Sequence, residues 1–272
     1  MSVIRFDDVS RVFSHDRSGV VALDHVSLEI ADREFVAIVG PSGCGKTTCL
    51  RLVAGLEFPS SGTVSVDGRK VMWPGPDRAV VFQQFALFPW KTVYENIELG
   101  LRARGMAAGK RREVIERYMD LMNLCGHEQA YPHQLSGGMQ QRVAIARAYA
   151  LAPGVLLMDE PFGALDAQTR VVMQEELVRV TRANPRTVLF ITHAVEESVY
   201  LADRVVVMTS RPGRVKEIID VRPVREANRW DQYKRIEDVM DLESFVRLRT
   251  HIWKSLRDER SGAEREVERV SA

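Results

Sequence analysis

The residues best suited to chemistry begin with a glycine-rich run, 40–48, which directly follows an apolar stretch at 35–39. Glycines let a backbone turn tightly and approach a ligand closely, and successive inward-pointing amides cradle an anion. A helix that starts near Lys46 adds about half a positive charge at its N-terminus. In the pattern G-x-x-x-x-G-K-[ST], Lys46 reaches the β- and γ-phosphates and the Thr47 hydroxyl holds Mg²⁺. The predicted nucleoside triphosphate site comprises Gly40, Pro41, Ser42, Gly43, Cys44, Gly45, Lys46, Thr47 and Thr48.

A second chemical feature is a pair of carboxylates, Asp159 and Glu160, at the end of the apolar run 155–158. At the carboxyl end of a buried parallel strand, such groups face the ligand crevice. Asp159 suits Mg²⁺, directly or through water, and Glu160 suits a general base that orients and deprotonates an attacking water. In isolation the pair could also be two solvated acids. The phosphate loop upstream favours the functional interpretation.

A third feature is Ser136-Gly137-Gly138, which precedes a helical pattern and makes another anion-binding helix start. Taken alone, this run is also an ordinary N-cap and turn. One nucleotide needs one phosphate cradle, so a second cradle suggests that each site is built from two chains.

The elements that must position these residues alternate along the chain. Short alternating segments at 3–6 and 26–30 predict half-exposed antiparallel strands. Further strands are predicted at 63–66, 79–82, 155–158, 188–191 and 205–208, and helices at about 46–56, 112–124, 139–151 and 167–183. The last three strands are continuous apolar runs, which are typical of a buried parallel sheet. Strands that alternate with helices predict an α/β fold, interrupted by a mostly helical stretch.

The run 135–140 resembles the signature of ATP-binding cassette (ABC) ATPases, and the other hallmarks of that family stand in the expected order. Gln83 resembles the Q-loop glutamine that contacts Mg²⁺ and water. Residues 163–166, ending at Asp166, resemble the D-loop that crosses the dimer interface. His193 resembles the switch histidine at the γ-phosphate, and Phe13 occupies the place of the aromatic residue that stacks on adenine, where many members have Tyr. The resemblance covers residues 3–215.

This resemblance implies a fold and a domain organisation. The fold is an α/β P-loop NTPase (RecA-like) core sheet with an N-terminal antiparallel β subdomain and an inserted helical subdomain. The expected cassette spans 1–220, with the helical subdomain at about 89–153. A C-terminal helical extension follows at 221–272, and its last dozen residues are expected to be frayed. Phe245, Leu248, Ile252 and Leu256 fall at helical spacing, which predicts a helix packed against the main domain or, alternatively, a docking or oligomerisation helix.

The resemblance also implies a mechanism with ATP and Mg²⁺. Two copies of the chain pair head to tail, and each ATP lies between the phosphate loop of one copy and the signature of the other. Glu160 is then the base, His193 the γ-phosphate sensor and Lys46 the phosphate clamp, with Thr47, Gln83 and Asp159 around Mg²⁺. The signature residues that contact ATP of the partner chain are Ser136, Gly137, Gly138 and Gln140.

Bulk properties limit the partners. The 272 residues carry 38 Lys plus Arg and 37 Asp plus Glu, and a net charge of +1 gives no electrostatic reason to expect nucleic acid. Three cysteines without a framework spacing fit a reducing cytosol. Because Cys44 lies inside the phosphate loop, bulky thiol reagents are expected to inhibit and ATP to protect. The sequence has no run near the roughly 20 apolar residues that a bilayer span needs.

A membrane role therefore requires a partner. The aromatic segment 84–90 suits a pocket for a short helix of a transmembrane permease subunit, although it could also be core. Segments 88–93, 158–170 and 211–214 look like the bacterial nitrate, sulfonate and taurine importer group. This resemblance implies a peripheral protein on the cytoplasmic face of the inner membrane that serves a periplasmic solute-binding protein indirectly. The transported solute is not fixed by these residues.

Three other classes compete with an importer subunit. A soluble ABC ATPase that is not coupled to transport usually carries paired cassettes or long coiled-coil insertions, and this sequence has neither. A P-loop kinase or GTPase would lack the 135–140 signature and would not need His193. A degenerate nucleotide-binding module is disfavoured by the presence of Glu160 and His193.

Overall fold

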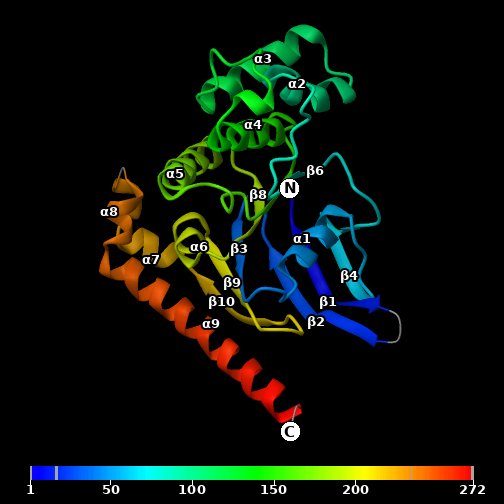
Figure 1. Ribbon diagram of the computed structural model, residues 1–272, viewed down its shortest axis with the longest axis vertical. Helices are drawn as coiled ribbons and strands as arrows, with labels where there is room; N and C mark the ends of the chain where they lie inside the picture. The colour runs from blue at the N-terminus through cyan, green and yellow to red at the C-terminus, as the bar shows by residue number, and fades with distance from the viewer. Residues whose placement is uncertain (1, 16–17, 234, 271–272) are drawn as a thin grey trace. The chain divides into compact units, whose positions relative to one another are not determined.

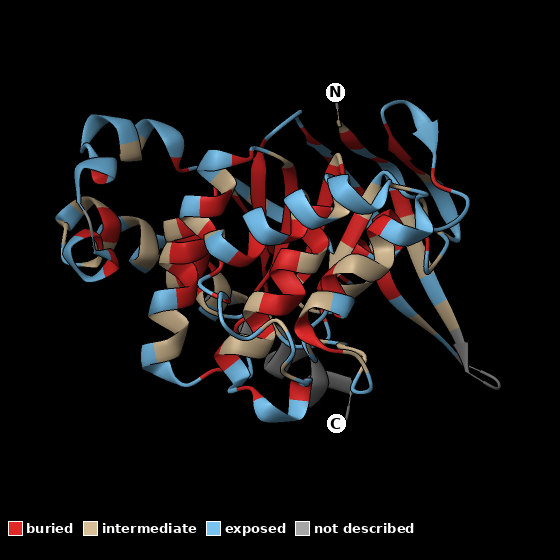
Figure 2. Ribbon diagram, turned by 90° about the horizontal axis from the view of Figure 1, so that it is seen from above, coloured by how far each residue is buried: buried red, intermediate tan, exposed pale blue. Residues whose placement is uncertain are grey.

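The computed structural model describes residues 2–15, 18–233 and 235–270 (Figure 1). The chain divides into two compact units, one formed by Met1–Gly75 together with Thr187–Ala272, and the other by Pro76–Arg186. Figure 2 shows buried residues concentrated on the strands and on the inner faces of the helices. Each unit therefore has apolar material of its own around which to pack.

The first unit begins with an antiparallel sheet in the order β2-β1-β4-β5. It is formed by β1 (Ile4–His15), β2 (Ser18–Ile30), β4 (Ser61–Val66) and β5 (Arg69–Lys70). Side chains alternate in burial along β1, as in buried Ile4 and Phe6 on either side of exposed Arg5, which is the pattern of a sheet with one solvated face. The antiparallel strands predicted at 3–6 and 26–30 are confirmed.

A second sheet in the same unit contains the elements that lead to the phosphate loop. Its strands are β3 (Phe35–Val39), β8 (Thr187–Ile191), β9 (Arg204–Met208) and β10 (Val215–Asp220). β3 pairs in parallel with both β8 and β9, and β10 adds an antiparallel edge. All residues of β3 and β8 are buried, as expected for a parallel strand covered on both faces. Helices α1 (Lys46–Ala54) and α6 (Val195–Leu201) pack on these strands.

The C-terminal extension closes the first unit. It contains α7 (Arg222–Ala227), η2 (Trp230–Gln232), α8 (Ile236–Met240) and α9 (Glu243–Val270). Helix α9 runs beside α6 and β9 (Figure 1), with Phe245 and Ile252 fully buried. The packed amphipathic helix is therefore confirmed. Of the last dozen residues, expected to be frayed, the backbone is helical up to Val270, and Ser271 and Ala272 lie outside the described residues.

The second unit has a short parallel pair, β6 (Arg78–Val81) and β7 (Val155–Asp159). Its helical elements are α2 (Val93–Ala103), α3 (Ala108–Leu121), η1 (Pro132–Gln134), α4 (Gly137–Ala150) and α5 (Ala167–Ala183). Helix α2 starts with a capping box in which the Thr92 hydroxyl accepts from the Glu95 amide and the Glu95 carboxylate accepts from the Thr92 amide. The predicted helical stretch 89–153 falls within this unit, and α5 has the bounds that the sequence pattern predicts.

Candidate active site

The phosphate loop joins β3 to α1, as its sequence predicts. Gly43 and Gly45 have φ values of 77° and 95°, a left-handed backbone that favours glycine. A Cβ at Gly45 would lie 2.5 Å from Leu23 Cδ2, and one at Gly40 would lie 2.7 Å from Cys44 Sγ. The first turn of α1 contains no acidic residue, so nothing on this turn opposes an anion at its positive end. The loop has the backbone shape that an anion cradle requires.

Lys46 lies at the centre of this loop and is only 5% exposed. Its Nζ donates to the Gly40 and Pro41 carbonyls at 2.9 and 3.0 Å. The same Nζ lies 3.4 Å from Nδ1 of His193, which follows β8. The structure therefore brings the predicted clamp and the predicted γ-phosphate sensor together within the first unit.

A buried hydrogen-bonded pair, which the sequence did not predict, supports the turn that carries His193. The Thr192 hydroxyl donates to the Glu197 carboxylate at 2.5 Å and accepts from the Ala194 amide at 3.0 Å. Thr192 and Glu197 are 3% and 5% exposed, whereas His193 is exposed. A buried polar pair is costly unless its members bond to each other, so this pair fixes the path of the turn. Only the periodicity of the short α6 could have indicated that Glu197, rather than the adjacent Glu196, is buried.

In the second unit, the structure brings Gln83 and Glu160 together after the parallel strands β6 and β7. Gln83 Nε2 donates to Glu160 Oε2 at 3.3 Å, and a Cβ on Gly163 would lie 3.5 Å from the same Nε2. Glu160 has a φ of 45°, which is uncommon for a residue with a side chain and costs on the order of 1–3 kcal/mol. Such strain concentrates at functional sites. The Q-loop amide and the predicted base thus lie at hydrogen-bonding distance.

The predicted signature has the local structure of a helix start. The Ser136 hydroxyl caps α4 by accepting from the Met139 amide at 3.3 Å, so the ordinary N-cap interpretation is also correct. Gln140 Nε2 donates to the Pro132 and Leu135 carbonyls at 3.0 and 3.2 Å, which turns this side chain back onto its own loop. Ser136 and Gly137 are exposed at the helix N-terminus. These two residues are available to a ligand or partner.

Gly138 and Asp166, both in the second unit, have structural roles of their own. A Cβ on Gly138 would lie 2.5 Å from Thr169 Cγ2, so α4 and α5 require a glycine at this contact. Asp166 caps α5 through the Thr169 amide at 3.0 Å and accepts from the Thr169 hydroxyl at 2.6 Å. The hydrogen bond from the Thr169 hydroxyl lowers the pKa of Asp166 most, and the bond from the Thr169 amide lowers it further. Asp166 is exposed, and its role at a dimer interface stays a prediction.

Phe13 lies on β1 opposite Val20 and is half-buried. The Arg11 guanidinium sits 4.5 Å from the centre of its ring and is itself held by Glu57 at 2.8 Å. One side of the ring therefore packs on a cation. Adenine stacking by Phe13 stays a prediction.

The cysteines correct one expectation. Cys44 is fully buried, and burial raises the pKa of its thiol. Burial also raises the pKa of Cys49 to about 12, whereas Cys125 is exposed. Because the thiolate is the reactive form, Cys44 is poorly placed for bulky thiol reagents. Cys44 therefore contributes to the phosphate loop through its backbone.

The donors predicted around Mg²⁺ fit a hard cation in chemical type. Thr47, in the first turn of α1, supplies a hydroxyl oxygen, and the half-buried Asp159 supplies a carboxylate at the end of β7. Mg²⁺ prefers such oxygens and usually keeps water and substrate phosphates as its remaining ligands. Among the described residues, no group of three His, Cys, Asp or Glu side chains could hold a metal by itself. The donor set therefore suits a cation that arrives with a nucleotide.

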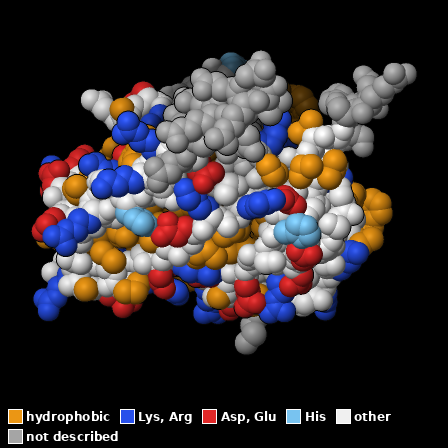
Figure 3. All heavy atoms as spheres, turned by 90° about the horizontal axis from the view of Figure 1, so that it is seen from below, with side chains coloured by type: hydrophobic (Ala, Val, Ile, Leu, Met, Phe, Trp, Pro, Cys, Tyr) orange, Lys and Arg blue, Asp and Glu red, His pale blue; other side chains and the backbone are white. Residues whose placement is uncertain are grey.

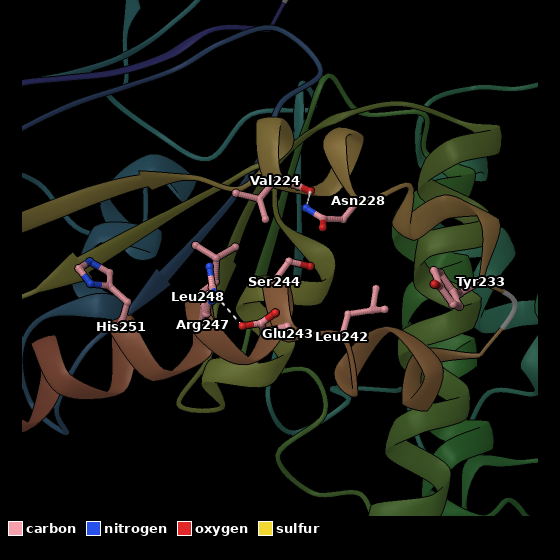
Figure 4. Close-up of a pocket in the computed structure, with 9 residues that line it drawn as sticks. All are labelled: Val224, Asn228, Tyr233, Leu242, Glu243, Ser244, Arg247, Leu248 and His251. Atoms are coloured by element: carbon pink, nitrogen blue, oxygen red, sulfur yellow. Dashed lines mark hydrogen bonds and ion pairs between the residues drawn. The ribbon is translucent and has the colours of Figure 1, made fainter.

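A cavity of about 740 Å³ lies in the C-terminal extension, away from these loops in the sequence (Figure 4). Apolar side chains of Val224, Leu242 and Leu248 form part of its wall. Its polar groups bond within the protein, as in Glu243 with Arg247 and Trp230 with Ser244. The cavity contains none of the residues predicted to act on a nucleotide.

The surface agrees with the near-zero net charge. On the face drawn in Figure 3, Lys and Arg side chains are interspersed with Asp and Glu. Within the described part of the chain, we find no helix with the length and apolar character to cross a bilayer.

Comparisons with known proteins place this site in a family. The family model described as ABC transporter matches residues 23–163. The chain is 46% identical over 256 residues to the ABC transporter ATP-binding protein MJ0412 of Methanocaldococcus jannaschii, which covers 94% of this chain and 92% of that protein. It is 49% identical over 218 residues to the nitrate import ATP-binding protein NrtD of Synechocystis, which covers 80% of this chain and 82% of that protein.

Solved structures agree with the sequence comparisons. The dimeric ABC transporter cassette MJ0796 matches with a TM-score of 0.71 and 33% identity, over 80% of this chain and 98% of that one. A second structure of that cassette is a post-hydrolysis state bound to ADP and Pi, with 32% identity. The family model covers more than half of this chain, and the relatives cover most of it. The chain belongs to the ABC transporter family and is an ATP-hydrolysing, ATP-binding subunit.

Proposed function

We propose that this ATPase energises an importer of small solutes of the nitrate, sulfonate or taurine type. The observation that carries the proposal is the 49% identity to a nitrate import ATP-binding protein over four-fifths of both chains. The working partners are a second copy of the chain, a transmembrane permease and, indirectly, a periplasmic solute-binding protein. The protein would then lie peripherally on the cytoplasmic face of the cell membrane.

The catalytic assignments follow from the two pairs of residues described above. Lys46 exchanges its bonds to the Gly40 and Pro41 carbonyls for phosphate oxygens, and neighbouring loop amides share the charge. His193, 3.4 Å from Lys46 Nζ, donates to the γ-phosphate. Glu160 accepts the proton of the attacking water, while Gln83 orients that water and the carboxylate. Bound Mg²⁺, held by Thr47, Gln83 and Asp159, would neutralise charge on the phosphates.

The second copy completes each site in this proposal. The exposed Ser136 and Gly137 of the partner would face the γ-phosphate, while Gly138 and Gln140 would hold the shape of the same loop. Asp166 would lie at the interface. The dimeric cassette MJ0796 supports this arrangement. ATP then favours the closed dimer, and hydrolysis releases it, because a ligand shifts a two-state equilibrium only by its differential affinity.

A rigid aromatic segment supports coupling to a permease. Trp90 is 70% exposed and its ring lies 5.7 Å from that of Phe88. Buried Asn96 fixes this loop by bonding both the amide and the carbonyl of Phe88. Arg147 donates to the carbonyls of Phe85 and Ala86. An exposed tryptophan on a pre-organised loop is a suitable anchor for a partner helix.

The proposal is tested by co-expressing the chain with a permease and solute-binding protein encoded beside it and measuring uptake in vesicles loaded with ATP. Wild type should support uptake of an oxyanion or sulfonate, and Glu160→Gln should not. Trp90→Ala should keep basal ATPase activity but lose co-purification with the permease. ATP hydrolysis by a chain that associates with no permease would instead favour a soluble ABC ATPase that is not coupled to transport.

A further inference from the structure

A tight turn at residues 209–214 separates β9 from β10 and packs on the phosphate loop within the same unit. The Thr209 amide donates to the Arg214 carbonyl at 3.0 Å, and the Thr209 hydroxyl accepts from the Arg214 amide at 2.9 Å. The same hydroxyl donates to the Pro212 carbonyl at 2.8 Å. These three bonds close the turn on itself.

The turn touches the nucleotide loop through a glycine. A Cβ placed on Gly213 would lie 1.9 Å from the Cys44 carbonyl oxygen and 3.0 Å from the Ala22 carbonyl oxygen. The carbonyl and the amide of a trans peptide point in opposite directions. The contact with Gly213 therefore holds the Cys44 carbonyl toward the turn, and the Gly45 amide of the same peptide points away from it. The orientation of this amide is what an anion cradle depends on.

Three further contacts join the turn to its surroundings. Gly213 exchanges backbone hydrogen bonds with β2, accepting from the Asp24 amide and donating to the Ala22 carbonyl, each at 3.0 Å. The Arg214 guanidinium binds the Asp24 carboxylate at 2.5 Å. A Cβ on Gly43 would lie 3.3 Å from Arg211 Nη2, so a guanidinium also lies beside the phosphate loop.

The C-terminal helix α9 also bonds to this turn and to the strand that follows it. The Glu259 carboxylate of α9 accepts from the Ser210 amide at 3.2 Å and binds Lys216 Nζ at 2.9 Å. Lys216 also donates to the Ser255 carbonyl at 2.8 Å. The side chains of Lys216 and Glu259 are 27% and 19% exposed, so this pair is screened less than a surface ion pair.

We propose that Glu259 is a positioning residue for nucleotide binding, which acts through the turn at 209–214 to set the backbone of the phosphate loop. A continuous set of contacts links α9, by way of Ser210 and Gly213, to Cys44. The C-terminal extension thus acts on ATP affinity without touching ATP. The inference rests on the proposed assignment of residues 40–48 as the nucleotide site.

The test measures binding of fluorescent N-methylanthraniloyl-ATP to the full chain in a Glu160→Gln background, which prevents hydrolysis during titration. Glu259→Gln should raise Kd by about three- to tenfold. Glu243→Gln is the matched control, because it removes a carboxylate from an exposed ion pair with Arg247 on the same helix. It should change Kd less than twofold.

A second pair of variants tests the turn itself. Gly213→Ala should raise Kd more than tenfold, because the new methyl group would clash with the Cys44 carbonyl. Gly109→Ala is its control, since a Cβ there meets nothing within 4 Å. In chains with Glu160 intact, Glu259→Gln should raise KM for ATP and leave kcat within about twofold, a split that general destabilisation would not produce.

Lys46→Ala separates failure of this inference from failure of the nucleotide-site assignment. If Lys46→Ala leaves Kd unchanged, the assignment itself is wrong. If Lys46→Ala weakens binding while Glu259→Gln behaves as Glu243→Gln does, the coupling by Glu259 is overturned. Loss of affinity in Glu259→Gln with an unchanged melting temperature supports the coupling. In the double variant Glu259→Gln/Lys216→Met, a Kd no weaker than that of Glu259→Gln alone supports a shared path.

Discussion

The two units differ in which parts of the chain form the predicted functional groups, the backbone in one and side chains in the other. In the first, the phosphate loop is built from backbone: left-handed Gly43 and Gly45, buried Cys44 and a lysine held by carbonyls. In the second, the residues predicted to act on water are side chains at the ends of two strands, Gln83 and Glu160. Recognition of a phosphate chain needs a fixed shape, whereas proton transfer needs one correctly placed group. Damage to the two regions should therefore produce different kinetic losses.

The largest expected effect is on turnover, from Glu160→Gln. Because the amide cannot accept the proton of water, kcat should fall by about 10²–10⁴-fold. ATP affinity should be kept, since the phosphate loop is untouched. Phosphate release and nucleotide binding are measured together, with exposed Glu113→Gln as the control. Normal turnover by Glu160→Gln would show that another group is the base and would remove the distinction between the units.

Next in size is Lys46→Ala, which removes the buried ammonium from the loop. Charge-assisted hydrogen bonds to phosphate are strong, so ATP affinity should fall by about tenfold or more and turnover should fall with it. Calorimetry measures the affinity, and Lys110→Ala on α3, exposed beside Glu113, serves as the control. Unchanged affinity would contradict the clamp role and leave the loop without its central cation.

A smaller effect is expected at Thr192, which supports the turn of His193. Thr192→Val keeps the shape but removes the donor to buried Glu197 and the acceptor for the Ala194 amide. Loss of a buried hydrogen-bond partner costs about 1–3 kcal/mol of unfolding free energy, and kcat should fall about tenfold. Chemical denaturation and steady-state kinetics measure the two losses. Thr192→Ser should restore both, and a Ser variant as poor as the Val variant would show that the hydroxyl is not responsible.

The smallest effect concerns thiol labelling. A raised pKa lowers the thiolate fraction at a given pH, so Cys44 and Cys49 should stay unlabelled at pH 8 under native conditions. Cys125 should react first and without loss of ATPase activity. Mass spectrometry of the labelled peptides identifies the site. Rapid inhibition by a bulky reagent at Cys44 would mean that the phosphate loop opens far more than its packing indicates.

The sequence predicted the elements best where one rule dominated. The apolar runs of β3, β8 and β9 had no competing interpretation, whereas the Asp166 cap of α5 was not predicted. The edge strand β10 was missed because its alternating burial follows a charged sequence without a strong apolar signal. The buried Thr192–Glu197 pair and the contact of Gly213 with Cys44 join segments that only the tertiary structure brings together. The motifs identified the chemistry, and packing determined which groups are accessible.

In the proposed mechanism, one nucleotide lies between the phosphate loop of one copy and the signature of another. The most direct test is a crystal or cryo-EM structure of Glu160→Gln with ATP and Mg²⁺. We expect a triphosphate that contacts Lys46 of one protomer and Ser136 of its partner. A triphosphate bound by Lys46 in a chain whose partner keeps Ser136 out of reach would contradict it.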